Sequence, residues 1–369
     1  MKPKSMPSGA ATYAGSGVSY KDLDQSKVRA QQLATHTLSG VEWLGVKPLE
    51  HYRGESSYVF QLPDGSHIAT VDEGLGTKIE IANYVYTATS DPYGYYVVGQ
   101  DTVGMIVNDL ATIRIPPISL QMHISVGTGS WLTDSSRVGA LYGGWVDATV
   151  ESGAVWSGGE TPALPGIIKK GTAVLAGSAT GYLPTPHLPL KENIKVGDVI
   201  IGVASDGIMA NGISLYRQVA DAQPKKLRLE MCLRALVPTL IYSPIIKMLI
   251  LANIMPSYMI HVTGHGWRKL MRARSPFRYV ITKLMPVLPV FTDFQKLGKI
   301  STREMWGNYN MGVGWIMIVR KGDVKTVLTL CRDLDFTADV IGHVEEGPKS
   351  VVIKPLRGLT FKDDSMKLR

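Results

Sequence analysis

The sequence predicts an α/β or α+β fold divided into two domains, and three observations support this prediction. A chain of 369 residues is too long for one hydrophobic core of ordinary size. Runs typical of strands alternate with runs at helical spacing in both halves of the chain. A proline-rich stretch at 183–199 separates the halves, as linkers often do. We therefore expect an arm and helix over 1–54, an N-terminal domain over 55–182 and a C-terminal domain over 190–369.

The composition is that of an ordinary globular protein with an excess of positive charge. Hydrophobic residues make up 45% of the chain, charged residues make up 19%, and the formal net charge is +8. This charge favours anionic partners such as phosphorylated small molecules, nucleic acid or acidic lipid. Cys232 and Cys331 lie far apart without a CxxC motif, which argues against a disulfide framework or a thiolate zinc site and suits a reducing cytosol.

The most apolar region of the chain, residues 236–260, is interrupted by three prolines and by Lys247. A membrane-spanning helix needs ~20 unbroken apolar residues, so we interpret this region as a buried helix. Residues 1–17 lack the continuous apolar core of a signal peptide. We therefore expect a cytoplasmic protein with no membrane partner.

The N-terminal half begins with a polar arm that contains Gly15 and Gly17 beside tyrosines, which suggests a flexible lid. Two β-rich runs then flank the turn Pro63-Asp64-Gly65 and predict a hairpin. The other elements that we expect in this half are helices near 25–37, at 104–113 and at 137–153, and strands at 118–127, from 154 into a loop that ends at 166, and at 171–183.

The C-terminal half opens with VGDVIIGVASDG (196–207), which predicts a buried strand followed by a glycine turn. A glycine-rich turn leading into a strand is predicted at 304–315. The other expected elements are helices at 212–220, 240–254, 267–274, 291–298 and 323–334, and strands at 259–264, 314–320 and 351–355.

An acidic and glycine-rich segment at 72–78, DEGLGTK, is the first candidate for chemistry. Gly74 and Gly76 would let backbone amides approach phosphate groups, and Lys78 would add a positive charge. Carboxylates so close to phosphate need a divalent cation between them, so Asp72 and Glu73 complete the pattern of a magnesium–nucleotide site. The segment does not match GxxxxGK[ST]. A surface turn with a solvated lysine is the alternative interpretation.

Asp101, Asn108 and Asp109 form a second polar group. Asp101 and Asn108 are seven residues apart and would share one face of a helix. Oxygen ligands from a separate element suit Mg²⁺. Alternatively, Asp101 only caps the start of the helix.

Three further glycine-containing turns hold polar side chains. In SGGETPALPG (157–166), Gly159 would allow close approach of the backbone, and Glu160 and Thr161 could orient a base, a ribose or a metal-bound water, although a plain β-turn is equally compatible. Two later turns each follow a strand and precede a helix, a geometry that binds anions. The residues that we expect to bind there are Ser205, Asn211, Gly212, Thr263, Gly264, His265 and Gly266.

Two other interpretations of this part of the sequence are weaker. His261 and His265 are four residues apart, but Gly264 would break the helix that zinc ligation at this spacing requires. The basic residues around 267–278 could bind RNA, yet no RNA-binding signature accompanies them. We expect neither a zinc site nor a nucleic-acid partner.

Taken in order, these segments resemble the phosphoribosylformylglycinamidine cyclo-ligase (aminoimidazole ribonucleotide synthetase) family. The matching stretches are GLGTK (74–78), QDTVGMIVND (100–109), SGGETPALPG (157–166), SDGIMANGISL (205–215), VPTLIY (237–242), VTGHG (262–266) and EMWGNYNMGVG (304–314). They are collinear over most of residues 70–315, and TYAGSGV (12–18) is similar to the mobile N-terminal segment of the family.

This resemblance implies two α/β domains and a homodimer in which the N-terminal domains form a shared β-barrel. It also implies ATP and Mg²⁺ as cofactors and formylglycinamidine ribonucleotide as substrate, which is cyclised through an iminophosphate to aminoimidazole ribonucleotide in purine biosynthesis. By motif position, Lys78, Asp101 and Glu160 would be catalytic. Asp72, Asp101 and Asp109 would hold Mg²⁺. The residues that would bind ATP are Glu73, Gly74, Gly76, Thr77, Lys78, Asn108, Gly159 and Thr161.

The chain departs from the family pattern at several positions and looks like a divergent branch. Glu73 stands where the family commonly has aspartate, Met209 where many members have histidine, and His265 interrupts a three-glycine turn. An expected glutamate is missing at Ala163-Leu164, and Ser19 replaces an acidic residue. These departures leave two alternatives open: another ATP-dependent enzyme of the same superfamily, or a non-catalytic nucleotide-binding homologue.

Overall fold

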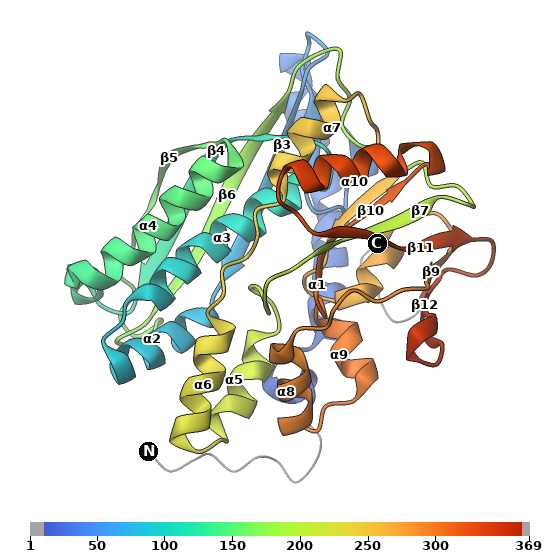
Figure 1. Ribbon diagram of the computed structural model, residues 1–369. Helices are drawn as coiled ribbons and strands as arrows, with labels where there is room; N and C mark the ends of the chain where they lie inside the picture. The colour runs from blue at the N-terminus through green and yellow to red at the C-terminus, as the bar shows by residue number, and fades with distance from the viewer. Residues whose placement is uncertain (1–10, 364–369) are drawn as a thin grey trace.

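A computed structural model describes residues 11–363 and shows two mixed β-sheets, each with helices packed against it (Figure 1). This is the two-domain α/β architecture that the alternation of strands and helices predicts. No helix within the described residues is both long and apolar enough to cross a membrane.

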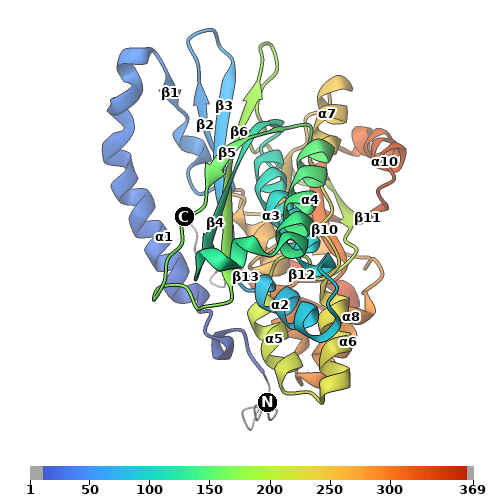
Figure 2. The same cartoon turned by 90° about the vertical axis from the view of Figure 1, so that its left-hand side faces the viewer.

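The N-terminal arm precedes both sheets in the chain. It consists of the short 3-10 helix η1 (Ala14–Ser16), helix α1 (Tyr20–Ala34) and the 3-10 helix η2 (Thr35–Leu44). Ser19 caps α1 by accepting a hydrogen bond from the backbone of Asp22. Figure 2 shows α1 along one side of the molecule, with strands of the first sheet between it and helices α3 and α4. The predicted helix near 25–37 therefore exists but begins five residues earlier.

The first sheet has the strand order β1-β2-β3-β6-β4-β5. The predicted hairpin is confirmed, because β2 and β3 pair in antiparallel fashion around the Pro63–Gly65 turn. The connection from β4 to β5 passes through α4, and these two strands are parallel. The strands are β1 (Lys47–Pro48), β2 (Tyr58–Gln61), β3 (His67–Leu75), β4 (Pro117–Val126), β5 (Val155–Glu160) and β6 (Ala173–Leu183), and the helices are α2 (Lys78–Thr89), α3 (Tyr93–Ala111) and α4 (Ser135–Ser152). Short 3-10 turns η3 (Glu50–Tyr52) and η4 (Gly129–Thr133) accompany them.

Helix α3 begins at Tyr93, well before the helix predicted at 104–113. The glycines in its first half do not end the helix, because at least one of them is needed for packing against α4. A Cβ atom on Gly99 would lie 2.2 Å from the carbonyl oxygen of Leu141, and one on Gly144 would lie 1.9 Å from that of Tyr96. The two glycines thus let α3 and α4 approach backbone to backbone. Asp101 consequently lies in the middle of α3 and not at a helix start, so its interpretation as an N-cap is wrong.

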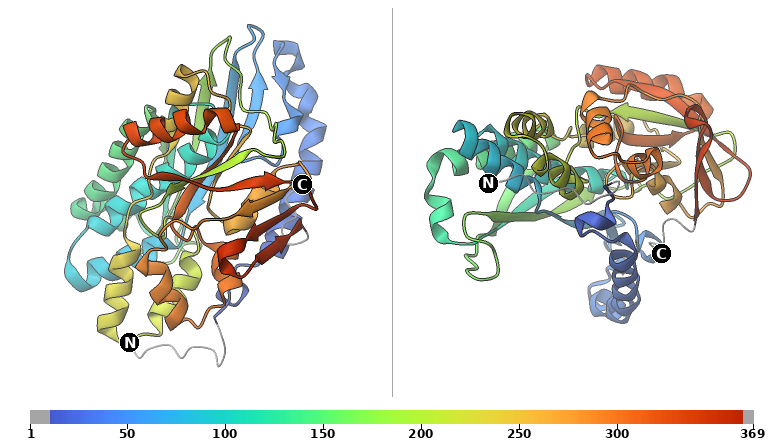
Figure 3. Two further views of the ribbon diagram at one scale, coloured as in Figure 1. Left: turned by 45° about the vertical axis from the view of Figure 1, so that its right-hand side comes forward. Right: turned by 90° about the horizontal axis from the view of Figure 1, so that it is seen from below.

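The second sheet has the strand order β13-β12-β9-β11-β7-β10-β8. Its described pairs are antiparallel apart from β12 with β9. Figure 3 shows α5, α6 and α8 gathered at one end of this half and α10 along the sheet. The strands are β7 (Val199–Ala204), β8 (Tyr258–His261), β9 (Arg278–Ile281), β10 (Val313–Val319), β11 (Ala338–Glu345), β12 (Ser350–Ile353) and β13 (Leu359–Lys362). The helices are α5 (Ile213–Asp221), α6 (Lys225–Ala235), α7 (Ser243–Leu251), α8 (Pro289–Leu297), α9 (Thr302–Asn308) and α10 (Val324–Asp333), with 3-10 turns η5 (Gly266–Arg272), η6 (Lys321–Asp323) and η7 (Lys354–Leu356).

Several predicted elements of this half need correction. The expected glycine-rich turn at 304–315 is helical in its first part, because Ser301 caps α9 by accepting from the backbone of Glu304. The expected basic helix at 267–274 is the 3-10 helix η5. In the apolar region 236–260 only α7 is helical, and residues before it run extended against α3. Elements β9, β11, β13 and α6 were not predicted.

The first sheet of this single chain is open, with β1 and β5 as its edges. The shared barrel of a homodimer therefore stays a prediction.

Candidate functional site

A buried ion pair joins Lys78 at the start of α2 to Asp101 in the middle of α3. The Lys78 Nζ atom lies 2.5 Å from Asp101 Oδ2, and neither side chain is exposed. Lys78 also donates to the carbonyl oxygens of Met209 (3.0 Å) and Val237 (3.2 Å), which belong to the C-terminal half. An ammonium group has three N–H donors, so contact of Lys78 with a phosphate requires the exchange of one of these bonds.

The face of α3 that carries Asp101 and Asn108 clamps the extended segment 237–242. Asp101 Oδ1 accepts from the backbone N–H (2.7 Å) and hydroxyl (2.8 Å) of Thr239. Asn108 accepts from the backbone N–H of Tyr242 (2.7 Å) and donates to the carbonyl of Leu240 (2.8 Å). The predicted common face of the two residues is confirmed, and it holds the two halves of the chain together.

Asp109, the residue after Asn108 in α3, lies in a cluster of charged groups between the two domains. Its Oδ1 atom is 3.1 Å from His261 Nδ1 on β8 and 3.9 Å from Lys269 Nζ on η5. Lys269 also donates to the Thr263 hydroxyl at 2.6 Å. Glu73, near the end of β3, faces the Asp109 carboxylate closely enough for the two groups to influence each other's charge.

The groups in this cluster shift one another's proton affinity. Burial and then the charge of Asp109 raise the pKa of Glu73 to about 8. Burial alone would also raise the pKa of Asp109, but Lys269 and His261 together hold it below its usual value. Burial lowers the pKa of Lys269 to about 8, against the opposing effect of Asp109. At neutral pH we therefore expect Glu73 to be protonated and Asp109 to be ionised.

The structure does not bring the three predicted magnesium ligands together. Asp72 is exposed on the face of β3 opposite to that of Glu73, because successive strand residues point to opposite faces. Asp101 is neutralised by Lys78. Among residues 11–363, no group of three or more His, Cys, Asp or Glu side chains converges as a metal site. Glu73 with Asp109 does fit Mg²⁺, which takes one or two carboxylates together with phosphate oxygens and water.

The glycine loop at 74–77 adjoins the first predicted anion-binding turn of the C-terminal half. The Thr77 hydroxyl lies 3.1 Å from that of Ser214 in α5. Gly74 and Gly76 are exposed, and a Cβ on Gly76 would meet nothing within 4 Å. Nearby, Asn211 is half-buried, and its Nδ2 atom has no hydrogen-bond partner within the described part of the chain. These loops therefore combine solvent-exposed backbone at Gly74 and Gly76 with the Asn211 side-chain amide, which is available to donate to a ligand.

Other residues of the predicted substrate turns support the packing of the 307–312 segment. Ser205 donates to the Asn310 side chain at 2.9 Å. A Cβ on Gly212 would lie 2.1 Å from the Tyr309 ring, and one on Gly266 would lie 2.7 Å from the backbone of Asn308. Both glycines also have positive φ angles, 75° and 50°. Their presence is therefore explained without a ligand.

The N-terminal arm covers the second anion-binding turn. Tyr20 stacks on the His265 ring with centroids 3.9 Å apart, and its hydroxyl accepts from the His265 backbone at 3.0 Å. Asp24 lies 3.0 Å from His265 Nε2. A Cβ on Gly264 would touch the Tyr20 hydroxyl at 3.1 Å. The expected arm thus lies against this turn.

Glu160 and Thr161 lie on another part of the first sheet. Strand register aligns Gly74, Ala176, His123 and Glu160 across β3, β6, β4 and β5. Three strand spacings separate Gly74 from Glu160 by roughly 14 Å. Both are exposed, and Gly159 allows β5 to approach β4, since a Cβ there would lie 2.0 Å from the Met122 carbonyl. Glu160 thus lies at the same end of the strands as the glycine loop but does not reach the cluster around Asp109.

Sequence reasoning missed two participants in this arrangement. In the sequence, Lys269 is one of the basic residues around 267–278 considered for RNA binding, but in the structure it is 2% exposed and faces Asp109. His261 is considered only as a zinc ligand, but its ring pairs with Asp109. The only signal in the sequence is that His261 directly precedes the VTGHG turn and Lys269 follows this turn by three residues.

Both halves of the chain match domains of a known protein family. Residues 54–183 match the N-terminal domain of AIR synthase related proteins, and residues 195–354 match the C-terminal domain. The phosphoribosylformylglycinamidine cyclo-ligase of Caldicellulosiruptor saccharolyticus is 32% identical over 313 residues, which cover 81% of this chain and 88% of that protein. That of Methanococcus maripaludis is 29% identical over 346 residues, or 91% and 92% of the two chains.

Solved structures with little sequence identity share the fold. The structure of a HypE–HypF complex matches with a TM-score of 0.59 at 16% identity, covering 85% of this chain and 94% of that one. HypE in complex with ATP matches with a TM-score of 0.58 at 16% identity, covering 80% and 83%. AaThiL complexed with AMPPCP and TMP matches with a TM-score of 0.55 at 12% identity, covering 82% and 87%. The two domain matches and the identity to the cyclo-ligases show that this chain belongs to the AIR synthase related protein family.

Proposed function

We propose that this protein is an ATP-dependent cyclo-ligase that converts formylglycinamidine ribonucleotide to aminoimidazole ribonucleotide. The observation that carries the proposal is a charged cluster between the domains, in which Asp109, His261 and Lys269 are buried and Glu73 is half-buried. It occurs in a chain whose relatives at 32% and 29% identity are cyclo-ligases.

The proposed reaction has two steps. The formamide oxygen of the substrate attacks the γ-phosphorus of ATP, ADP leaves, and an iminophosphate forms. The amidine nitrogen of the same molecule then attacks the activated carbon, phosphate leaves, and loss of a proton completes the imidazole ring. Because ring closure is intramolecular, the protein has chiefly to hold the reactants and stabilise the developing charge.

Residues of the cluster and its neighbouring loops would perform these tasks. Asp109, together with Glu73 after that carboxyl has released its proton, would hold Mg²⁺, which when bound supplies positive charge to the phosphoryl group being transferred. The open backbone at Gly74 and Gly76 would hydrogen-bond phosphate oxygens. The unpartnered Asn211 amide would bind the substrate. We assign Lys78 and Asp101 the role of holding the glycine loop in place.

A second candidate is another ATP-dependent reaction of the same family on a different substrate. It is favoured by Met209 and Glu73, which replace residues common among the cyclo-ligases, and by the short distance between Lys269 and Asp109.

The first proposal includes a homodimer. Light scattering of the purified protein, which measures its molar mass in solution, tests this part of the proposal.

The proposal is tested by incubating purified protein with formylglycinamidine ribonucleotide, ATP and Mg²⁺. We expect ADP and aminoimidazole ribonucleotide to appear in equal amounts. Asp109→Asn should lower the rate by at least ~100-fold, in the range found for groups that stabilise transition-state charge. Asp333→Asn on the exposed surface of α10 is the matched control and should leave the rate unchanged. Wild-type protein that is folded and binds ATP but forms no aminoimidazole would favour the second candidate.

A further inference from the structure

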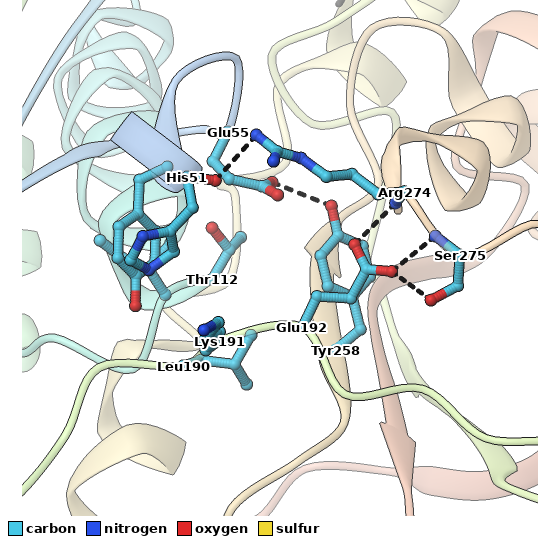
Figure 4. A pocket seen from close by; sticks show the side chains of 11 residues that line it. His51, Glu55, Thr112, Leu190, Lys191, Glu192, Tyr258, Arg274 and Ser275 are labelled. Atoms are coloured by element: carbon cyan, nitrogen blue, oxygen red, sulfur yellow. Dashed lines mark hydrogen bonds between the residues drawn. The ribbon is translucent and has the colours of Figure 1, made fainter. Parts of the chain in front are cut away.

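A cavity of about 360 Å³ lies at the seam between the two domains, apart from the cluster around Asp109 (Figure 4). It is lined by the η3 region of the first domain, the end of α3, the interdomain linker, the start of β8 and the loop after η5. The lining residues are His51, Tyr52, Glu55, Thr112, Ile113, Leu190, Lys191, Glu192, Tyr258, Arg274 and Ser275.

The two carboxylates in the wall of this cavity are satisfied by the protein. Glu192 accepts from the backbone N–H groups of Arg274 (2.6 Å) and Ser275 (2.7 Å) and from the Ser275 hydroxyl (2.5 Å). Glu55 accepts from the Tyr258 hydroxyl at 2.9 Å. Figure 4 shows Glu192 turned toward the 274–275 backbone and Glu55 toward Tyr258. Their negative charge is thus partly compensated by fixed donors.

The basic side chains of the wall are not paired with a carboxylate. Within residues 11–363, neither Lys191 nor Arg274 forms an ion pair. The Arg274 guanidinium donates to the carbonyl oxygen of His51 at 3.1 Å. Burial lowers the pKa of His51, the charges of Lys191 and Arg274 lower it further, and the charge of Glu55 opposes them.

From this arrangement we propose that the seam cavity binds a small organic oxyanion, a phosphate monoester or a carboxylate. Arg274 offers a planar fork of donors and Lys191 a point charge, and both suit oxyanions. Ile113 and Leu190 give an apolar wall for the organic part of the ligand. A volume of about 360 Å³ is within the range of small-molecule sites.

An occupant would touch the same elements that hold the Asp109 cluster. Thr112 and Ser57 both donate from their hydroxyls to the Asp109 carbonyl, at 2.8 and 3.2 Å. Tyr258 lies three residues before His261 on β8. A ligand bound between the domains and the linker would therefore stabilise their arrangement, and binding should raise the midpoint of thermal unfolding.

The test is isothermal titration of the purified chain with inorganic phosphate, and separately with acetate. Lys191→Met removes one charge from the cavity, and its side chain is exposed, so folding should be unaffected. Lys195→Met, an exposed lysine on the same linker, is the matched control. We expect a binding event that weakens at least tenfold in Lys191→Met and in Arg274→Gln but is unchanged in Lys195→Met.

Phosphate could also bind at the glycine loops near Asn211, so the variants decide which event belongs to the cavity. Binding of either anion that is weakened by the two cavity variants supports the proposal and identifies the class of oxyanion. Isotherms of both anions that are identical in wild type, Lys191→Met and Lys195→Met would overturn it. Cyclo-ligase activity plays no part in this readout, so the outcome is independent of the proposed function.

Discussion

Lys78 and Asp101 form an ion pair of 2.5 Å in which neither side chain is exposed to solvent. The pair links the glycine loop of the first domain to the 237–239 segment of the second, because both partners also bond to that segment. A predicted phosphate-binding lysine thus acts in this structure as the anchor of an interdomain contact.

Breaking this pair should destabilise the protein strongly. Lys78→Met would leave the Asp101 carboxylate buried without its charge partner, which costs about 3–5 kcal/mol. Urea unfolding followed by circular dichroism measures the loss. The double variant Lys78→Met/Asp101→Asn should recover part of it, since no unpaired charge remains. Equal stabilities of wild type and Lys78→Met would contradict a structural role.

Glu73 should contribute a loss of stability between about pH 5 and pH 8. The native pKa of Glu73 is raised to about 8 from 4.5, so over this window the native state binds a proton that the unfolded state has released. The contribution of Glu73 is therefore lost as the pH rises through this range. Buried histidines such as His261 and His265, whose pKa values are lowered by burial, contribute the opposite slope at the acidic end of the window. The difference in urea midpoint between wild type and Glu73→Gln should therefore shift against wild type as the pH rises from 5 to 8. Lys269, with a pKa lowered to about 8, acts above this window. Parallel slopes in the two proteins would refute the assignment.

The glycine contact between α3 and α4 should tolerate no side chain. Gly99→Ala places a Cβ 2.2 Å from the Leu141 carbonyl oxygen, so the helices must separate. We expect a loss of about 1–3 kcal/mol, as for other overpacked cores. Gly139→Ala in α4 is the control, because its Cβ would meet nothing within 4 Å. Relief of the glycine penalty in a helix should make that variant more stable by up to ~1 kcal/mol, as thermal unfolding would show.

Removal of the Tyr20 ring should loosen the N-terminal arm. Tyr20→Ala loses both the stack on His265 and the hydrogen bond from its backbone, whereas Tyr20→Phe keeps the stack. Hydrogen exchange of residues 13–24 should therefore accelerate most in Tyr20→Ala and less in Tyr20→Phe. Unchanged exchange in the alanine variant would show that other contacts, such as Tyr13 with Glu304, suffice to hold the arm.

Short-range patterns in the sequence predicted much of the fold. The hairpin around Pro63–Gly65, the helix closed by Gly153 and the shared face of Asp101 and Asn108 all depend on spacing and turn chemistry within a few residues. The boundaries of α3 could not be predicted from such patterns. Glycine usually indicates a turn, but Gly99 of α3 is required by the close packing of α4 against it.

The sequence by itself determined the two α/β halves, their family and the segments that hold polar groups. Only the tertiary structure decided which of these groups meet. It paired Lys78 with Asp101, placed Glu73 and Lys269 beside Asp109, and turned Asp72 to the opposite face of β3. Local periodicity fixes the direction of a side chain along its own element. The partner of a buried charge depends instead on how distant elements pack, because burial without a counter-charge is too costly to persist.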